Sequence, residues 1–146
     1  MKKYYAFLVL LGIGFAACTK NNDVAPDSSS RIAGTYQLTY IRQDSADVVD
    51  SLVLPYIVGG QTVISGTITA TRIAGTTPTD SLAVSLTVQG QASTSPLGRV
   101  EVRTNGNSYD LYSGTDKVGT ADGTNIEIDT DPANTQTFRL VLRGKK

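Results

Sequence analysis

The chain has 146 residues, which is enough for one domain with a single core and too few for two ordinary domains. Apolar residues make up 40% of it and charged residues 18%, a composition too apolar for a disordered protein. Thirteen basic residues balance thirteen acidic ones and are scattered along the chain, without the clustered basic footprint that nucleic-acid binding needs. We therefore expect one globular unit and no nucleic-acid partner.

The first seventeen residues are typical of an export signal. Lys2 and Lys3 precede an apolar run over residues 4–15, and two small residues, Ala16 and Ala17, follow it. Twelve helical residues reach only ~18 Å, short of the ~30 Å hydrocarbon core of a bilayer. The pattern therefore predicts a cleaved signal peptide over residues 1–17.

Residues 15–18, Phe-Ala-Ala-Cys, resemble the lipobox of bacterial lipoproteins. The resemblance implies that the thiol of Cys18 receives a diacylglyceryl group and that Cys18 becomes the new, acylated N-terminus, with palmitate as a typical acyl chain. A plain secretory signal cut after Ala17 is the alternative, although Phe15 is large for that peptidase. The resemblance implies a lipid-anchored protein of the cell envelope, with the outer membrane favoured and its periplasmic or surface-exposed face left open.

The segment after the cysteine differs in composition from the rest of the chain. Residues 19–30 are polar, with three consecutive serines at 28–30, and such a segment cannot bury a core. We therefore divide the exported chain into a lipidated flexible tether at 18–30 and a folded domain at 31–146.

The domain shows a period-two alternation of apolar and polar residues, the pattern of β-strands, and no long helical periodicity. Leu82, Val84, Leu86 and Val88, for example, share one face of a strand. The pattern predicts eight strands, at residues 32–42, 61–73, 79–90, 97–104, 107–113, 116–121, 124–130 and 135–143.

Turn residues indicate how these strands connect. Asn-Gly at 105–106 and Asp-Gly at 122–123 tolerate positive φ in a two-residue hairpin, and Gly-Thr at 114–115 suits a third. Residues 97–130 are therefore expected to form a four-stranded meander, preceded by a loop at 90–96. Because eight antiparallel strands leave two open edges unless the last pairs with the first, we predict an all-β, eight-stranded antiparallel up-and-down barrel. A two-sheet β-sandwich is the alternative.

The longest predicted connection, residues 43–60, begins acidic and then turns apolar. We interpret it as an extra irregular strand or a flap that plugs one end of the core. The functional alternative is a lid over a ligand cavity, formed by Leu52, Leu54, Tyr56 and Ile57.

Residues 32–38, in the first predicted strand, resemble the opening of lipocalin-like domains, in which a Gly-x-Trp motif starts the barrel. Gly34 matches the glycine, and Tyr36 stands where the family has Trp. The resemblance implies a lipocalin-like barrel in which an arginine near the last strand, Arg139 or Arg143, packs over the aromatic ring. The exported domain is similar to the small lipocalin-like lipoproteins of Bacteroidetes, most of which have no assigned function.

Alternation also predicts which side chains point into the barrel. The inward set is Ile32, Tyr36, Leu38, Tyr40, Ile64, Ile68, Leu82, Val84, Leu86, Val88, Val100, Val102, Ile126, Ile128, Phe138, Leu140 and Leu142. Gly66 and Ala70 would leave room at one side, so a small apolar ligand is one possible occupant. Its predicted lining is Tyr36, Leu38, Tyr40, Ile64, Ile68, Leu86, Phe138 and Leu140. A core filled by its own large aliphatic side chains is the alternative.

The sequence offers little catalytic chemistry. It contains no histidine, and lipidation would consume its single thiol, which removes the usual general base, the cysteine nucleophile and the commonest zinc ligands. The acidic groups that remain candidates for acid–base chemistry or calcium are Asp44, Asp47, Asp50, Asp129 and Asp131. Their spacing matches no calcium loop, and we interpret them as turn residues. We expect no enzyme activity, no cofactor and no metal, and a carboxylate-based hydrolase ranks third among the functions considered.

These observations lead to a non-enzymatic, membrane-anchored envelope lipoprotein as the expected function. It would be a lipocalin-like binding module for a small apolar ligand or a protein partner. The alternative is a solid-core structural, interaction or inhibitor protein of the envelope. We expect a monomer.

Overall fold

The computed structural model describes residues 27–45, 48–75, 77–133 and 136–146. The predicted signal peptide and Cys18 lie outside the described residues. The elements are α1 (Ser28–Ile32), β1 (Gly34–Ser45), β2 (Val48–Val53), β3 (Tyr56–Val58), β4 (Gln61–Ile73), β5 (Thr79–Val88), β6 (Gln91–Asn105), β7 (Ser108–Ser113), β8 (Asp116–Ala121), β9 (Asn125–Asp129) and β10 (Phe138–Lys145). No helix in the described ranges is long and apolar enough to cross a membrane.

Eight of the strands close an antiparallel barrel, as predicted. Their order is β1-β10-β9-β8-β7-β6-β5-β4, and pairing between β1 and β4 closes the ring. The last strand pairs with the first over Gln37–Ser45. This closure removes the open edges that an eight-stranded sheet would otherwise leave.

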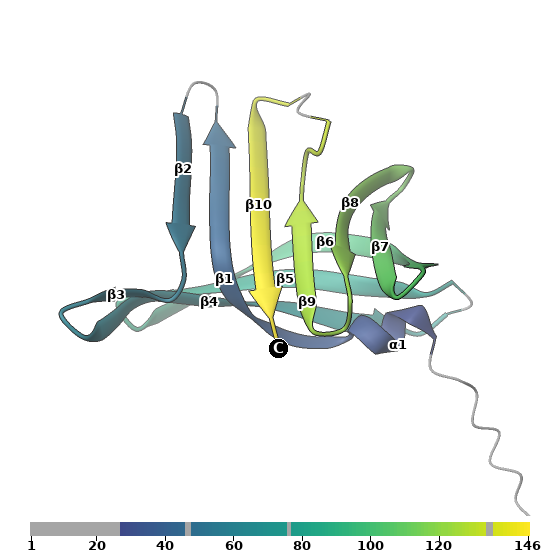
Figure 1. The fold of residues 1–146 in the computed structure, drawn as a ribbon, viewed down its shortest axis with the longest axis horizontal. Coiled ribbons are helices and arrows are strands. Elements are labelled where there is room, and N and C mark those ends of the chain that lie inside the picture. Colours follow the sequence, from purple (N-terminus) through teal and green to yellow (C-terminus); the bar gives the residue numbers. More distant parts are fainter. Residues whose placement is uncertain (1–26, 46–47, 76, 134–135) are drawn as a thin grey trace, which may run out of the picture.

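The two remaining strands lie where the barrel seam opens. β1 and β4 pair only over Gly34–Gln37 and Thr67–Ala70, and beyond this short contact they diverge. β2 then pairs with the upper half of β1, and β3 pairs with the first residues of β4. Figure 1 shows the result: β1 and β2 rise together, while β3 and β4 form an arm that projects to the left. The segment predicted as a long connection is therefore mostly two extra strands.

The hairpins form where turn residues predicted them, with small shifts. Gly114 and Thr115 form the β7–β8 turn, as expected, whereas the β6–β7 turn is centred one residue later than predicted, on Gly106 and Asn107. The predicted loop at 90–96 is wrong. Gln89 and Gly90 both adopt positive φ and make the turn, after which β6 pairs with β5 at once.

Pro96 explains why the sequence pattern did not predict the first part of β6 as a strand. It lies beside a register shift at Leu82 and Ala83, a β-bulge. A bulge is one of the few places where a strand interior tolerates proline, which lacks the N–H that the ladder needs. The polar and small residues of 91–98 therefore belong to a strand despite their loop-like composition.

The core is continuous and α1 closes one end of it. Ile32, Tyr36, Ile68, Leu111 and Leu142 are among the fully buried side chains. The Oγ atoms of two serines of α1 donate to backbone carbonyls of β6 and to the start of β5. The predicted boundary between tether and domain, at residue 30, therefore falls inside α1, which is part of the folded domain.

Three residues predicted to point inward lie elsewhere. Val88 and Phe138 are 46% and 47% exposed, because they stand at strand ends beyond the closed part of the barrel. A bulge between Leu38 and Tyr40 shifts the register of β1, so that Tyr40 pairs with Arg143 on the outer face. One extra residue in a strand inverts the alternation after it, and nothing in the alternation of the sequence marks where that residue is.

Candidate functional site

The barrel interior was the first predicted site, and its side chains fill it. The room expected beside Gly66 is occupied: a Cβ at this residue would lie 2.8 Å from Leu38 Cδ1, 2.8 Å from Leu86 Cδ2 and 2.7 Å from the carbonyl oxygen of Ser85. The small residue thus permits close packing of two leucines and leaves no space for a ligand beside it.

One hollow that reaches interior side chains of the described residues is small. It measures about 130 Å³ and lies near the β7–β8 turn, where Leu82, Val100 and Ile128 meet Leu97 and Val118. Ligand pockets usually measure ~300–1,000 Å³, so this space is short of a typical carrier cavity.

The predicted lining residues divide into three groups. Tyr36, Leu38 and Ile68 are buried in the core, and Ile64, Leu86 and Leu140 are partly buried against it. Tyr40 is outside the barrel, and Phe138 is exposed at the start of β10. The structure therefore does not bring these eight side chains together around one space.

Tyr36 is fixed from both of its ends. Its hydroxyl donates to the carbonyl oxygen of Ile32 at 2.6 Å, and Lys146 Nζ lies 4.7 Å from the ring centroid. Burial raises the pKa of Tyr36 to about 12. The resemblance-based expectation that Arg139 or Arg143 covers this ring is wrong, because Lys146 takes that place.

The outer face of β1, β9 and β10 carries a network of ion pairs. Arg139 binds Asp129 with two hydrogen bonds, at 2.5 and 2.9 Å, and its Nη1 lies 3.8 Å from a carboxylate oxygen of Asp44. Asp44 also accepts from Arg42 at 2.7 Å. The hydrogen bonds from Arg139 lower the pKa of Asp129. These acids are therefore held by arginines, and the described residues contain no group of three acidic side chains placed to hold a metal ion.

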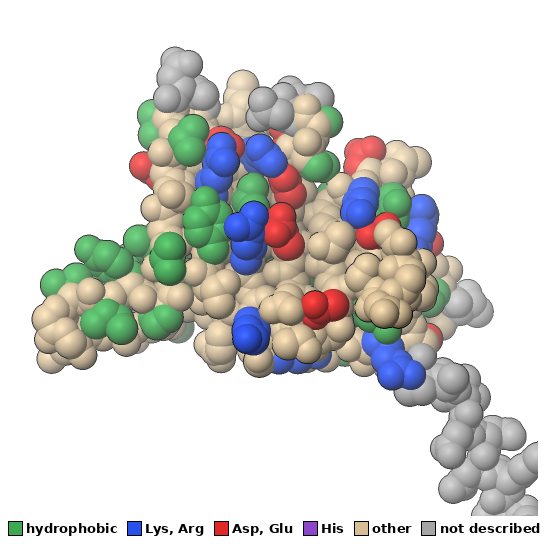
Figure 2. Space-filling model, in the orientation of Figure 1, with side chains coloured by type: hydrophobic (Ala, Val, Ile, Leu, Met, Phe, Trp, Pro, Cys, Tyr) green, Lys and Arg blue, Asp and Glu red, His purple; other side chains and the backbone are tan. Residues whose placement is uncertain are grey.

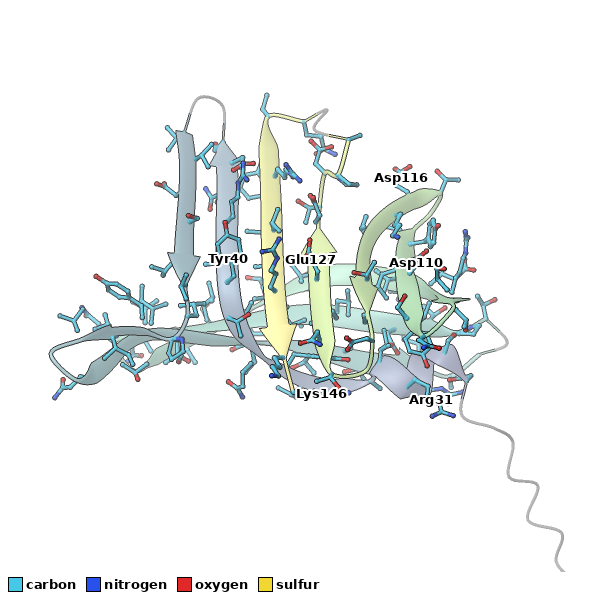
Figure 3. The ribbon with its side chains drawn as sticks, viewed as in Figure 1. Arg31, Tyr40, Asp110, Asp116, Glu127 and Lys146 are labelled. Atoms are coloured by element: carbon cyan, nitrogen blue, oxygen red, sulfur yellow. The ribbon has the colours of Figure 1, made fainter. Side chains whose placement is uncertain are left out.

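Beside this network lies a hollow on the outer face, about 430 Å³ in volume. Its walls carry charges of both signs, with Glu127 and Arg143 paired to each other at 2.9 Å. Figure 3 shows Tyr40 and Glu127 on this face, on either side of β10. Because two acidic and two basic side chains line it, the hollow has no evident preference for ligands of one charge.

The third candidate site consists of the two unpaired strand edges, on β2 and β3. These strands stand at the two ends of the sheet order, so each has one side without a neighbour. Eight large apolar side chains of the described residues are exposed, and six belong to these strands. We call this set the open-edge patch: Val48, Val49, Val53, Tyr56, Ile57 and Val58. Figure 2 shows apolar side chains gathered over β2 and along the β3–β4 arm.

Most of the patch and the strands after it come from sequence segments with few charges, although β2 pairs with Arg42 and Asp44 of β1. Residues 51–71 include no charged residue, and residues 81–98, which form most of β5 and the first part of β6, include none either. Soluble proteins usually protect a strand edge with lysine, proline or an inward-pointing charge. Asp50 is the single charge on β2, and β3 has none.

The predicted lid residues are part of this region but do not form a lid. Leu54 is buried in the core, Leu52 packs partly against it, and Tyr56 and Ile57 are exposed on β3. Pairing with β1 and β4 holds the segment within the sheet. Sequence reasoning missed Val48, Val49, Val53 and Val58, for which the local run of valines without a basic residue was the available signal.

No protein-family model, no curated protein and no solved structure matches this chain.

Proposed function

We propose that the protein is a non-enzymatic, lipid-anchored interaction module of the bacterial cell envelope, which binds protein through the open-edge patch. One observation carries the proposal: six of the eight exposed large apolar side chains of the described residues lie on the two unpaired strands. Exposed apolar patches and open edges of this kind mark interaction sites, because strand addition satisfies the free backbone groups and buries the side chains.

The packing of the interior supports this choice over a ligand carrier. Leu38 and Leu86 fill the space beside Gly66, and the hollow near the β7–β8 turn is about 130 Å³. The barrel then serves as a rigid support for the two edges.

Site-specific cross-linking in the native envelope tests the proposal. Ile57, which is 55% exposed, is replaced by cysteine and labelled with a benzophenone maleimide in the full-length chain. We expect a light-dependent protein adduct that Val53→Lys greatly reduces. Thr104→Cys, an exposed site on β6, is the matched position at which no such adduct is expected.

Native mass spectrometry of the same purified chain tests the competing function. A discrete small molecule that is released on denaturation, together with no adduct at position 57, would contradict the proposal and favour a carrier.

A further inference from the structure

We infer that the partner of the β2 edge is a second copy of this chain, added as an antiparallel strand about a two-fold axis that passes beside Ser51. This inference rests on the proposed function, since it assigns an occupant to part of the open-edge patch. It departs from the monomer expected from the sequence.

The free backbone groups of β2 belong to every second residue of the strand. Leu54 donates its N–H to the carbonyl oxygen of Thr39 at 2.9 Å, in the same register as the β1–β2 ladder. Bonded and non-bonded pairs alternate along an antiparallel ladder. The N–H and C=O groups of Val49, Ser51 and Val53 therefore point toward the open edge.

The side chains of the same three residues form a symmetric pattern. They lie on one face of the sheet, the face of Tyr40 and Arg42, with which Val53 and Ser51 pair. Val49 and Val53 are 60% and 71% exposed. The order apolar, polar, apolar is the same in both chain directions. A second copy that runs antiparallel can therefore place valine opposite valine and serine opposite serine.

Symmetry restricts which residues can oppose each other, and the valine pattern then favours one register. A two-fold axis normal to the sheet keeps the outer faces of both copies on one side, so directly opposed residues must share a face. Centring on Ser51 places each Val49 opposite Val53 of the second copy, joined by free backbone groups. Asp50 then lies opposite Leu52 of the second copy.

Charge disfavours the neighbouring register that is centred on Asp50. Centring on Asp50 would place two carboxylates directly opposite each other, which destabilises a strand pair. With Ser51 at the centre, Asp50, the only charged residue of β2, does not face Asp50 of the second copy. Residues 51–71 carry no charge and add no repulsion.

The short edge explains why anchorage matters. Six residues make a small interface compared with the ~1,200–2,000 Å² of a stable complex, so pairing between dissolved copies is weak. Lipid anchors that confine copies to one membrane raise their effective concentration and favour the pair. The test therefore uses the full-length chain in its membrane.

The test is disulfide trapping of Ser51→Cys in intact membranes, with diamide as the oxidant. We expect a homodimer on non-reducing gels that reducing agent dissolves, and a yield at least about fivefold lower when Val53→Lys removes two cross-strand valine contacts. The unchanged chain, which has Cys18 alone, and Ser113→Cys, an exposed position at the end of β7, control for random collision. Circular dichroism melting of each variant confirms that the barrel is folded.

Two outcomes would overturn the inference. Folded Ser51→Cys that stays monomeric under oxidation excludes self-pairing, whether or not the adduct at position 57 is found. A disulfide from position 51 to a different protein also excludes it, yet leaves the proposed interaction function standing. Failure of the proposed function itself is recognised separately, by a bound small molecule without an adduct at position 57.

Discussion

Lys146 and Tyr36 join the end of β10 to the beginning of β1. The ammonium group of Lys146 lies 4.7 Å from the centroid of the Tyr36 ring and donates to the carbonyl oxygen of Ala33 at 2.9 Å. Figure 3 shows Lys146 at the lower end of the sheet, below the last residues of β10. The ring is fully buried, so one cation both covers an aromatic side chain of the core and binds the backbone that precedes β1.

Replacing Lys146 by methionine removes this cation but keeps most of the aliphatic stem. We expect the free energy of unfolding to fall by about 1 kcal/mol, from the lost cation–π contact and hydrogen bond. Urea denaturation measures the change. Lys145→Met, next to it and also exposed, is the matched control, and equal effects of the two substitutions would contradict the assigned role.

The comparison of sequence and structure shows which features a pattern can predict. Alternation and turn residues are local, and they predicted the barrel and the pairing of its last strand with its first. Tyr40 was misplaced because the bulge before it inverts the alternation without a signature in residue type. The open edges depend on where β1 and β4 part, after only four paired residues on each strand. That parting is set by the twist and closure of the whole barrel.

Asp80 predicts how stability depends on pH. It is fully buried at the start of β5, and one of its oxygens accepts from Ser29 Oγ at 2.6 Å. Burial raises the pKa of Asp80, although the hydrogen bond from Ser29 opposes the shift. The folded state therefore holds this proton more tightly than the unfolded state does. Its contribution to stability is full below the ordinary carboxyl pKa near 3.8 and is lost as the pH rises through the raised value.

The substitution Asp80→Asn removes that titration and keeps an oxygen that accepts from Ser29. We expect a higher melting temperature at pH 7 and a smaller decline in melting temperature above pH 4, as measured by calorimetry. Asp116→Asn changes the same charge at an exposed position. A melting temperature at pH 7 that falls in Asp80→Asn alone would show that the ionised form of Asp80 stabilises the fold.

The pKa of Asp27 is shifted in the opposite direction from that of Asp80. Its carboxylate caps α1 through the N–H of Ser30 and pairs with Arg72, and these contacts, led by the hydrogen bonds from Arg72, lower its pKa from 3.8 to about 2. Its contribution to stability is present above pH 3.8 and is lost as the pH falls toward 2. We expect Arg72→Met to lose less stability than the unchanged chain between pH 3.8 and pH 2. Acid titration followed by tyrosine fluorescence measures this difference. An unchanged acid profile would exclude the pair as its source.

Arg139 is expected to matter more than the neighbouring Arg143. Arg139 and Asp129 are mostly shielded from solvent, at 23% and 17% side-chain exposure, whereas Arg143 and Glu127 are about half exposed. Arg139→Met should lower the free energy of unfolding by about 1–3 kcal/mol, because it leaves a shielded carboxylate without its partner. Arg143→Met should cost less than about 1 kcal/mol. Urea denaturation measures both variants. A larger decrease in the free energy of unfolding for Arg143→Met than for Arg139→Met would contradict this ordering.

Gly66 provides the sharpest test of whether the interior is filled. Two leucine methyl groups and a carbonyl oxygen lie within 3.0 Å of the position that a Cβ would take, and one of these three neighbours is backbone. Gly66→Ala should therefore lower the free energy of unfolding by about 1–3 kcal/mol, the usual cost of overpacking. The double variant Gly66→Ala with Leu86→Val should recover part of this loss, since it removes bulk from one of the crowding side chains. If Gly66→Ala were neutral or stabilising, the interior would have spare room beside β4, and a ligand-carrying barrel would regain support over the solid core.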